Sequence, residues 1–206
     1  MQTATHGSVA TGTTAADVKI SELSNDSLIV RLHFTINHLS RWLTPVHDRT
    51  KLERSLRRGE PSVKELIIRL RDEELRTFPK LHLIAIDTNP NLDRLPEYVR
   101  SAQQDADDER LSSLSAMAEF RRLRQSSCSL LRSLPDKAWS RVGTSRREHD
   151  WQVRSLAEHL ANHDLDVLYD IDMTLDRVGA RDGVNQVSRA HLDELLRLVP
   201  VTLRRS

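Results

Sequence analysis

The sequence is poor in the residues that define several large classes of protein. It has a single cysteine, Cys128, which excludes an intrachain disulfide and is typical of a reducing compartment. Aromatic residues make up only 4% of the chain, and there are just six glycines and seven prolines. Leu, Ala, Arg and Glu are abundant instead, and this composition favours helices over an all-β fold.

Neither the charge nor the hydrophobic pattern indicates nucleic acid or a membrane as a partner. Lys and Arg total 31 against 30 Asp and Glu, so the net charge of +1 gives no electrostatic basis for binding nucleic acid. The sequence lacks a run of about 18 apolar residues, and its N-terminus lacks the charged and apolar regions of a signal peptide. We therefore expect a cytoplasmic protein.

Apolar residues recur at helical spacing in four long segments, which predicts an all-α, four-helix bundle with long crossover connections. Asn25 or Asp26 is expected to cap the first helix. Ser62 and Glu65 form an S-x-x-E capping box at the start of the second, in which Pro79 marks a break or a kink. The helices are expected at 25–43, from 62 onward, at 113–133 and at 151–175.

Polar segments flank this predicted bundle. Residues 1–22 are rich in Thr, Ala, Ser and Gly without an apolar period, which predicts a disordered leader. The bundle itself is expected at 23–178. The remaining residues, 179–206, read as a C-terminal extension with a short helix from Ser188 to Leu198.

Two charged features are typical of solvated surface. The connector at 88–113 is the longest polar stretch, and the aspartates within 105–108 should face water. A connection of this length usually crosses a bundle or lines a cleft. The basic turn at 121–124 also reads as a solvated helix face, although helical spacing leaves either Leu123 or Arg124 on the core side.

The fourth predicted helix carries the residues best suited to chemistry. His163 falls in the apolar row that faces the other helices, His159 lies one turn before it, and Asp166 and Asp170 flank that face. Two histidines four residues apart on a helix can hold one transition metal when a third ligand comes from elsewhere. The alternative is a buried His163 that is hydrogen-bonded to a neighbour, with His159 at the surface.

Two segments resemble the DinB/YfiT-like family of four-helix bundles. EPSVKELIIRLRDEELRTFPKL, at 60–81, is similar to the family's second-helix segment. EFRRLRQSSCSLLRSLPDKAWSRVGTSRREHDWQVRSLAEHLANHDLDVL, at 119–168, is similar to its third helix, the following connector and its fourth helix with a His-x-x-x-His ending. The order and spacing of these motifs carry the resemblance over most of residues 25–175.

The resemblance implies a divalent metal, usually zinc or nickel, held by one histidine of the second helix and two of the fourth. The corresponding positions in this sequence are Arg69, His163 and Val167. A guanidinium stays protonated and has no free lone pair, and valine has no donor atom. We therefore expect no metal site and no metal cofactor.

Two other arrangements of these residues remain open. His159, His163 and Asp166 would form a shifted metal site if the helix turned a different face to the cavity. Alternatively, Arg69 replaces the charge of the metal by pairing with an acid, or it extends outward from the edge of the core. The acids considered for that pairing are Asp166, Asp170 and Glu73.

The resemblance also implies a range of functions. The family includes thiol-dependent S-transferases and isomerases, is often homodimeric, and uses its metal as a Lewis acid. Because that mechanism does not transfer to this sequence, we expect binding of a small molecule or a protein partner in the bundle cleft. Trp139 and Trp151 are expected to pack at the bundle ends, with lining of the cleft as the alternative. The alternative is a metal- or thiol-dependent transferase or hydrolase with an altered site around His163.

Overall fold

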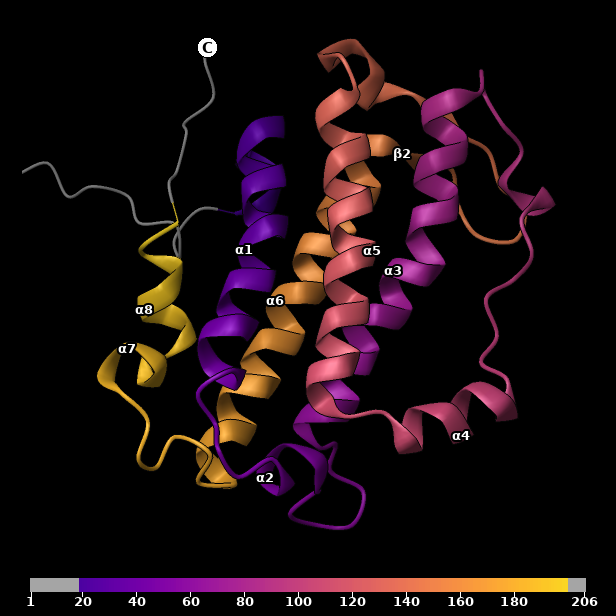
Figure 1. The fold of residues 1–206 in the computed structure, drawn as a ribbon. Helices are drawn as coiled ribbons and strands as arrows, with labels where there is room; N and C mark the ends of the chain where they lie inside the picture. The colour runs from indigo at the N-terminus through magenta and orange to yellow at the C-terminus, as the bar shows by residue number, and fades with distance from the viewer. Residues whose placement is uncertain (1–18, 200–206) are drawn as a thin grey trace, which may run out of the picture.

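A computed structural model describes residues 19–199, and residues 1–18 and 200–206 lie outside the described residues (Figure 1). Most of the leader predicted at 1–22 therefore cannot be compared with the structure. Its last residues form a short 3-10 turn, η1 (Ile20–Glu22), and Ile20 is only 7% exposed. Ile20, near the end of the predicted leader, is thus part of the packed structure.

Four long helices lie side by side and form the body of the molecule (Figure 1). α3 packs against α5 and α6, and α1 packs against the same two helices. α1 and α6 run in one direction while α3 and α5 run in the other, so the chain must cross the length of the bundle between α3 and α5. The predicted all-α, four-helix bundle with crossover connections is confirmed. The bounds are α1 Asn25–Leu43, α3 Val63–Ile86, α5 Ser113–Ser133 and α6 Val153–Arg177.

The connectors hold short elements of their own. Two of them are joined, because the amide of Leu92 donates to the carbonyl of Thr144 at 2.8 Å and the amide of Thr144 donates to the carbonyl of Pro90 at 2.9 Å. The long connector and the segment before α6 therefore meet on one side of α3. The elements are α2 Thr50–Glu53, η2 Leu92–Arg94, α4 Ala102–Arg110, η3 Asp136–Ser140, β1 Val142–Gly143 and β2 Trp151–Gln152.

The capping residues explain where α1 and α3 begin. The hydroxyl of Ser24 accepts a hydrogen bond from the amide of Ser27 at 3.1 Å, so Ser24 is the N-cap of α1 and the prediction of Asn25 or Asp26 is wrong. The predicted capping box of α3 is confirmed: Ser62 accepts from the Glu65 amide at 3.2 Å, and Glu65 accepts from the Ser62 amide at 2.6 Å.

Pro79 does not end α3, which continues to Ile86. A proline inside a helix removes one backbone hydrogen bond and opposes helix formation. Leu81 and Ile84, which lie beyond the proline, are both fully buried. Their packing against the core compensates for the proline, so the segment after Pro79 stays helical.

α6 begins two residues later than predicted, because Trp151 and Gln152 belong to a strand. β2 pairs antiparallel with β1, with Gly143 opposite Trp151. A Cβ atom at Gly143 would lie 2.7 Å from the side chain of Ile84 and 2.8 Å from that of Leu92, so only glycine fits against α3 at this point. The short hairpin thus brings Trp151 to the side of α3.

The C-terminal extension packs against the bundle. Instead of one helix from Ser188 to Leu198, it forms α7 (Gln186–Arg189) and α8 (Leu192–Leu196). The chain turns between them, and the N-caps are Asn185 and His191 rather than Ser188. Leu192, Leu195 and Leu196 are at most 2% exposed and belong to the same apolar cluster as residues of the four long helices.

Among the helices that the structure describes, none combines the length and the hydropathy needed to cross a bilayer.

Candidate functional site

The three metal-ligand positions expected from the sequence resemblance share no polar site. Arg69 is exposed and makes no hydrogen bond or ion pair with the residues that the structure describes. Val167 is 5% exposed and packs in the core. His163 lies half-buried on α6. Arg69 thus extends into solvent, and the pairing of Arg69 with an acid is not observed.

The alternative metal site, formed by His159, His163 and Asp166, is only partly assembled in the structure. His159 and His163 lie on the side of α6 that faces α3, but Asp166 is exposed and bonds to neither histidine within the described chain. The acid next to the histidines is Glu73 of α3, whose Oε1 lies 2.7 Å from Nε2 of His159. From the sequence, Glu73 was a candidate only as a partner of Arg69. Glu73 lies one turn after Arg69, on the helix side that was expected to face α6, and this spacing was the one signal for its position.

Glu73 is fully engaged by its neighbours. Its side chain is 7% exposed, it forms an ion pair with Arg76, and it accepts a hydrogen bond from the Thr77 hydroxyl at 3.2 Å. Burial alone would raise the pKa of Glu73, but the bond from His159 and the charge of Arg76 outweigh it and lower that pKa to about 2. The carboxylate is therefore ionised at neutral pH and holds the imidazole of His159 in place.

His163 stays neutral beside this pair. Burial lowers the pKa of His163, and the nearby charge of Glu73 opposes that effect only in part. Its Nδ1 atom is buried and has no hydrogen-bond partner among the described residues. This nitrogen is a hydrogen-bonding group that a ligand could satisfy.

These residues do not fit a bound metal ion in this arrangement. A metal needs three or more donors that converge with free lone pairs. Within residues 19–199, no group of three His, Cys, Asp or Glu side chains lies close enough to hold one. Both oxygens of Glu73 already accept bonds from Arg76, Thr77 and His159. A metal would have to displace those partners.

The buried cation of this bundle is Arg124 of α5, not Arg69. Arg124 is fully buried and forms ion pairs with Glu74 of α3 and Asp164 of α6. It also donates to the carbonyl of Leu32 in α1 at 3.1 Å, while the Thr35 hydroxyl donates to Asp164 at 2.7 Å. We call this set the buried arginine network. The expectation of a solvated basic turn is wrong for Arg124, which joins all four long helices.

The charges of the network are balanced inside the protein. Burial alone would lower the pKa of Arg124, but the charges of Asp164 and Glu74 outweigh it and raise that pKa above its usual value. Ser127 donates a further hydrogen bond to Glu74 at 2.5 Å. Because each carboxylate has its partners, the network has no group left for chemistry and fills the centre of the bundle.

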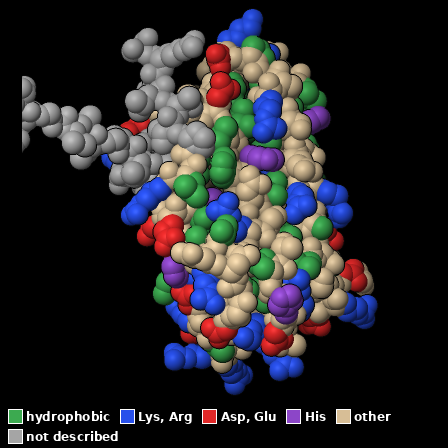
Figure 2. All heavy atoms as spheres, turned by 60° about the vertical axis from the view of Figure 1, so that its left-hand side comes forward, with side chains coloured by type: hydrophobic (Ala, Val, Ile, Leu, Met, Phe, Trp, Pro, Cys, Tyr) green, Lys and Arg blue, Asp and Glu red, His purple; other side chains and the backbone are tan. Residues whose placement is uncertain are grey.

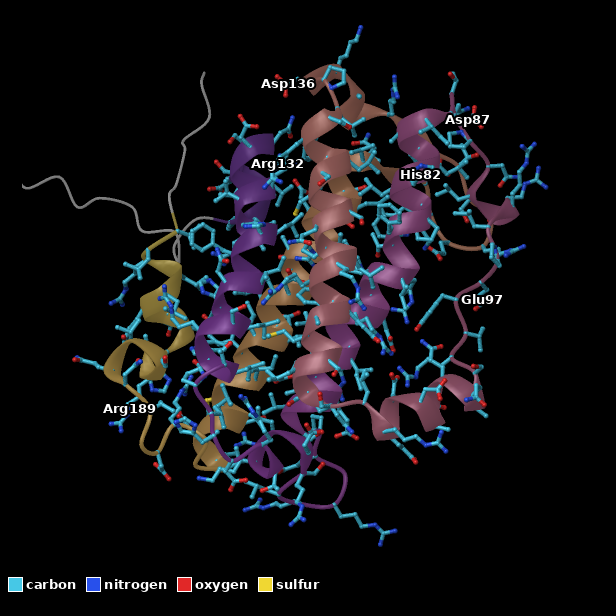
Figure 3. All side chains as sticks on the ribbon, in the orientation of Figure 1. His82, Asp87, Glu97, Arg132, Asp136 and Arg189 are labelled. Carbon is cyan, nitrogen blue, oxygen red and sulfur yellow. The ribbon has the colours of Figure 1, made fainter. Side chains whose placement is uncertain are left out.

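A cleft lies beside α3, where the two joined connectors cover it. We call it the connector cleft; its volume is about 290 Å³. Figure 3 places Glu97 on the segment that passes outside α3. The lining residues are Leu75, Arg76, Pro79 and Lys80 of α3, with 92–93, 95–98, Ser145, Arg147 and Glu148 of the connectors.

Trp151 links this cleft to the histidines. Its indole nitrogen donates to Glu148 at 2.8 Å, and its ring centroid lies 5.5 Å from that of His159. Lys80 lies over the same ring, 5.7 Å from the centroid. Trp139, by contrast, is 4% exposed and packs in the core. Trp151 thus makes polar and cation–π contacts with two residues that line this cleft, Glu148 and Lys80.

Comparison with known proteins identifies the class of fold. The described bundle is similar in structure to YfiT from Bacillus subtilis, described as a probable metal-dependent hydrolase with an unusual four-helix bundle topology. The TM-score is 0.60 at 17% sequence identity, over 75% of this chain and 87% of that one. No protein-family model and no curated protein matches the sequence. The chain therefore shares the four-helix-bundle fold of YfiT.

Proposed function

We propose that the protein binds a small molecule in the connector cleft and works without a resident metal. The observation that carries this proposal is the joining of two distant connectors over α3. They cover a cleft whose lining mixes apolar and charged side chains, and whose volume of about 290 Å³ lies just below the usual lower limit of about 300 Å³ for ligand pockets. Arg76 belongs both to this rim and to the Glu73–His159 pair.

The polar groups near the cleft favour binding over catalysis. Glu73 accepts bonds from three side chains, so it is a poor general base, and Lys80 is neutralised by Glu148 at 2.7 Å. A ligand could instead stack on the ring of Tyr98, which Arg76 already contacts at 5.6 Å from the ring centroid. We also propose that the protein is a homodimer, and light scattering can test this oligomeric state. We further propose that it works in a reducing compartment.

The alternative is a metal- or thiol-dependent transferase or hydrolase with an altered site around His163. The unpartnered Nδ1 atom of His163 is the observation that favours it. Such an enzyme would need the Glu73 carboxylate to release its present partners.

Two measurements separate these functions. The first is a fragment screen followed by NMR of the Trp151 indole N–H, which lies at the cleft. Fragments should shift this signal in the wild type and not in Tyr98→Ala; a screen without any shift would reject the cleft as a binding site. The Trp42 indole, which is buried in the other apolar cluster and donates to the carbonyl of Ala190, is the internal control.

The second measurement is thermal unfolding with zinc, nickel and low-molecular-weight thiols. A ligand that binds the folded state raises the melting temperature according to RT ln(1 + [L]/Kd). We expect no rise. A rise that His163→Ala abolishes, or stoichiometric metal removed only by a chelator, would support the enzyme and contradict the metal-free proposal.

A further inference from the structure

A second cavity lies between α3, α4 and α5, and its volume is about 580 Å³. This volume is within the usual range of about 300–1,000 Å³ for ligand pockets. Three leucines, Leu75, Leu111 and Leu123, line the cavity together with polar side chains. We call it the α4 groove. Figure 1 shows α4 beside the lower end of α5.

α4 does not cover the apolar floor of this groove. Asp108 is the one buried residue of α4, and its Oδ2 atom accepts a hydrogen bond from Arg71 of α3 at 2.7 Å. The helix contains no leucine, isoleucine or valine that could pack against the bundle. Leu75 and Leu123 are partly exposed, and neither belongs to the apolar clusters formed by the described residues. Uncovered apolar side chains that line a cavity are typical of a binding site.

The α4 groove adjoins the connector cleft. Leu75 lines both cavities. Tyr98 lines the cleft and Gln104 lines the groove, and Nε2 of Gln104 donates to the Tyr98 hydroxyl at 2.9 Å. Tyr98 follows Glu97, which Figure 3 places on the segment that leads into α4. A linear ligand that stacks on Tyr98 can therefore extend from one cavity into the other.

The charged side chains of the α4 groove are largely engaged with one another. Arg71 pairs with Asp108 and with Glu119, and Asp107 accepts a hydrogen bond from Gln103 at 2.9 Å. These pairings leave the leucines, with the exposed Arg122 at the rim, as the surface that a ligand meets. The groove is therefore better suited to an apolar chain than to a polar group.

The connector cleft offers free charges instead. Glu97 and Arg147 line it, and their side chains make no hydrogen bond or ion pair within residues 19–199. Because both are exposed, they can bind a polar group without giving up an existing partner. One carries a negative and the other a positive charge, so the cleft can receive a head group of either sign.

We infer that the two cavities form one site for a linear amphiphile. Its polar head lies in the connector cleft, and its apolar chain lies on Leu75 and Leu123 in the α4 groove. This inference rests on the proposed function, because it requires a ligand in the cleft. Each methylene that the leucines remove from water strengthens binding about fourfold, so the chain adds affinity to that of the head group.

The test is the binding of straight-chain carboxylates and straight-chain amines of about four to ten carbons, below the concentrations at which they form micelles. NMR follows the Trp151 indole N–H, which bonds to Glu148 of the cleft, and the methyl groups of Leu123 in the groove. We expect the affinity to rise about fourfold per added methylene until the chain fills the groove. The Leu123 methyl signals should shift only with the longer members.

Two substitutions in the groove test the position of the chain. Leu123→Gln should remove most of the gain per methylene and leave the binding of the shortest members unchanged. Ser126→Glu should have the same effect, because it places a charge in the groove at an exposed position that the core does not need. Leu198→Gln is the control: Leu198 is 64% exposed and follows α8, on the side of the bundle that Figure 2 turns forward.

The outcomes separate this inference from the proposed function. Short members that bind while longer ones bind no tighter would overturn the shared site and keep the connector cleft as a binding site. An equal gain per methylene in the wild type and in both groove variants would place the chain elsewhere and also reject it. If no member of either series binds, the amphiphile is rejected, and the fragment screen decides the cleft by itself. Circular dichroism shows whether each variant is folded before the titration.

Discussion

Arg124 is the residue on which the centre of the bundle depends. Its guanidinium forms ion pairs with two buried carboxylates, those of Glu74 and Asp164. Replacing a buried ion pair as a whole can be neutral, but removing one member leaves uncompensated charge in the core. The effect of a single substitution should therefore be large.

We predict that Arg124→Met lowers the free energy of unfolding by about 3–5 kcal/mol, because Glu74 and Asp164 lose their counter-charge. Urea denaturation measures the change. Arg122→Met is the matched control: Arg122 is exposed on the same helix, and its substitution should stay within about 0.5 kcal/mol. A loss below about 1 kcal/mol for Arg124→Met would show that the network does not stabilise the core.

His38 makes stability depend on pH. Its pKa is about 4 in the folded protein and near 6.5 when unfolded, so between these values the unfolded chain binds more protons. Stability should therefore fall as the pH drops from 6.5 to 4, by an amount on the order of 2–3 kcal/mol. Urea denaturation from pH 7 to pH 4 tests this. His38→Phe should flatten the curve in that window, and an unchanged slope would refute the assignment.

The site residues show what a single sequence can and cannot predict at this scale. Helical spacing places His163 toward the other helices, and it leaves Leu123 and Arg124 as alternatives on the core side. It does not predict that the arginine is the buried one, because the carboxylates that neutralise it come from α3 and α6. Glu73 was missed as the partner of His159 for the same reason: the pair forms between helices that are distant in sequence.

At the scale of elements, the long helices were predictable and the connectors were not. The apolar period and the capping box at Ser62 define the helices, so α5 matches its predicted range in full. The 88–113 connector reads as loop because it is polar, yet it contains α4. Asp108, expected in water, is 7% exposed and pairs with Arg71 and Arg100. The ion pairs of Asp108 with Arg100 and with Arg71 of α3 hold this helix in place of an apolar face.

We predict that Asp108→Ala loosens α4 while leaving the bundle folded. Hydrogen exchange should rise across 102–110, because Asp108 provides the link from α4 to Arg71. Exchange in α3 should change little, since Arg71 keeps its bonds to Asp72 and Glu119. Asp107→Ala, an exposed aspartate of the same helix, is the control. Equal exchange in both variants would contradict a role for the buried pair.

For the whole molecule, the sequence predicts the fold class but not how its parts meet. The connector cleft depends on hydrogen bonds between Leu92 and Thr144 and between Thr144 and Pro90, and no local pattern encodes these. The C-terminal extension is a second example. Its sequence predicts a short helix, but it does not predict that the leucines of α8 pack against the bundle. In the structure they share the apolar cluster that contains Leu39 and Trp42 of α1.

The extension should therefore unfold together with the bundle. Removing 179–206 takes away Leu192, Leu195 and Leu196 and uncovers the flank of α1 that carries Trp42. Each buried leucine contributes about 1.5–3 kcal/mol, so the free energy of unfolding should fall by several kcal/mol. Guanidinium denaturation followed by Trp fluorescence measures this, and the full chain should show one transition. Removing only 200–206 keeps every described residue and is the control. A truncated chain as stable as the full one would make the extension a separate unit.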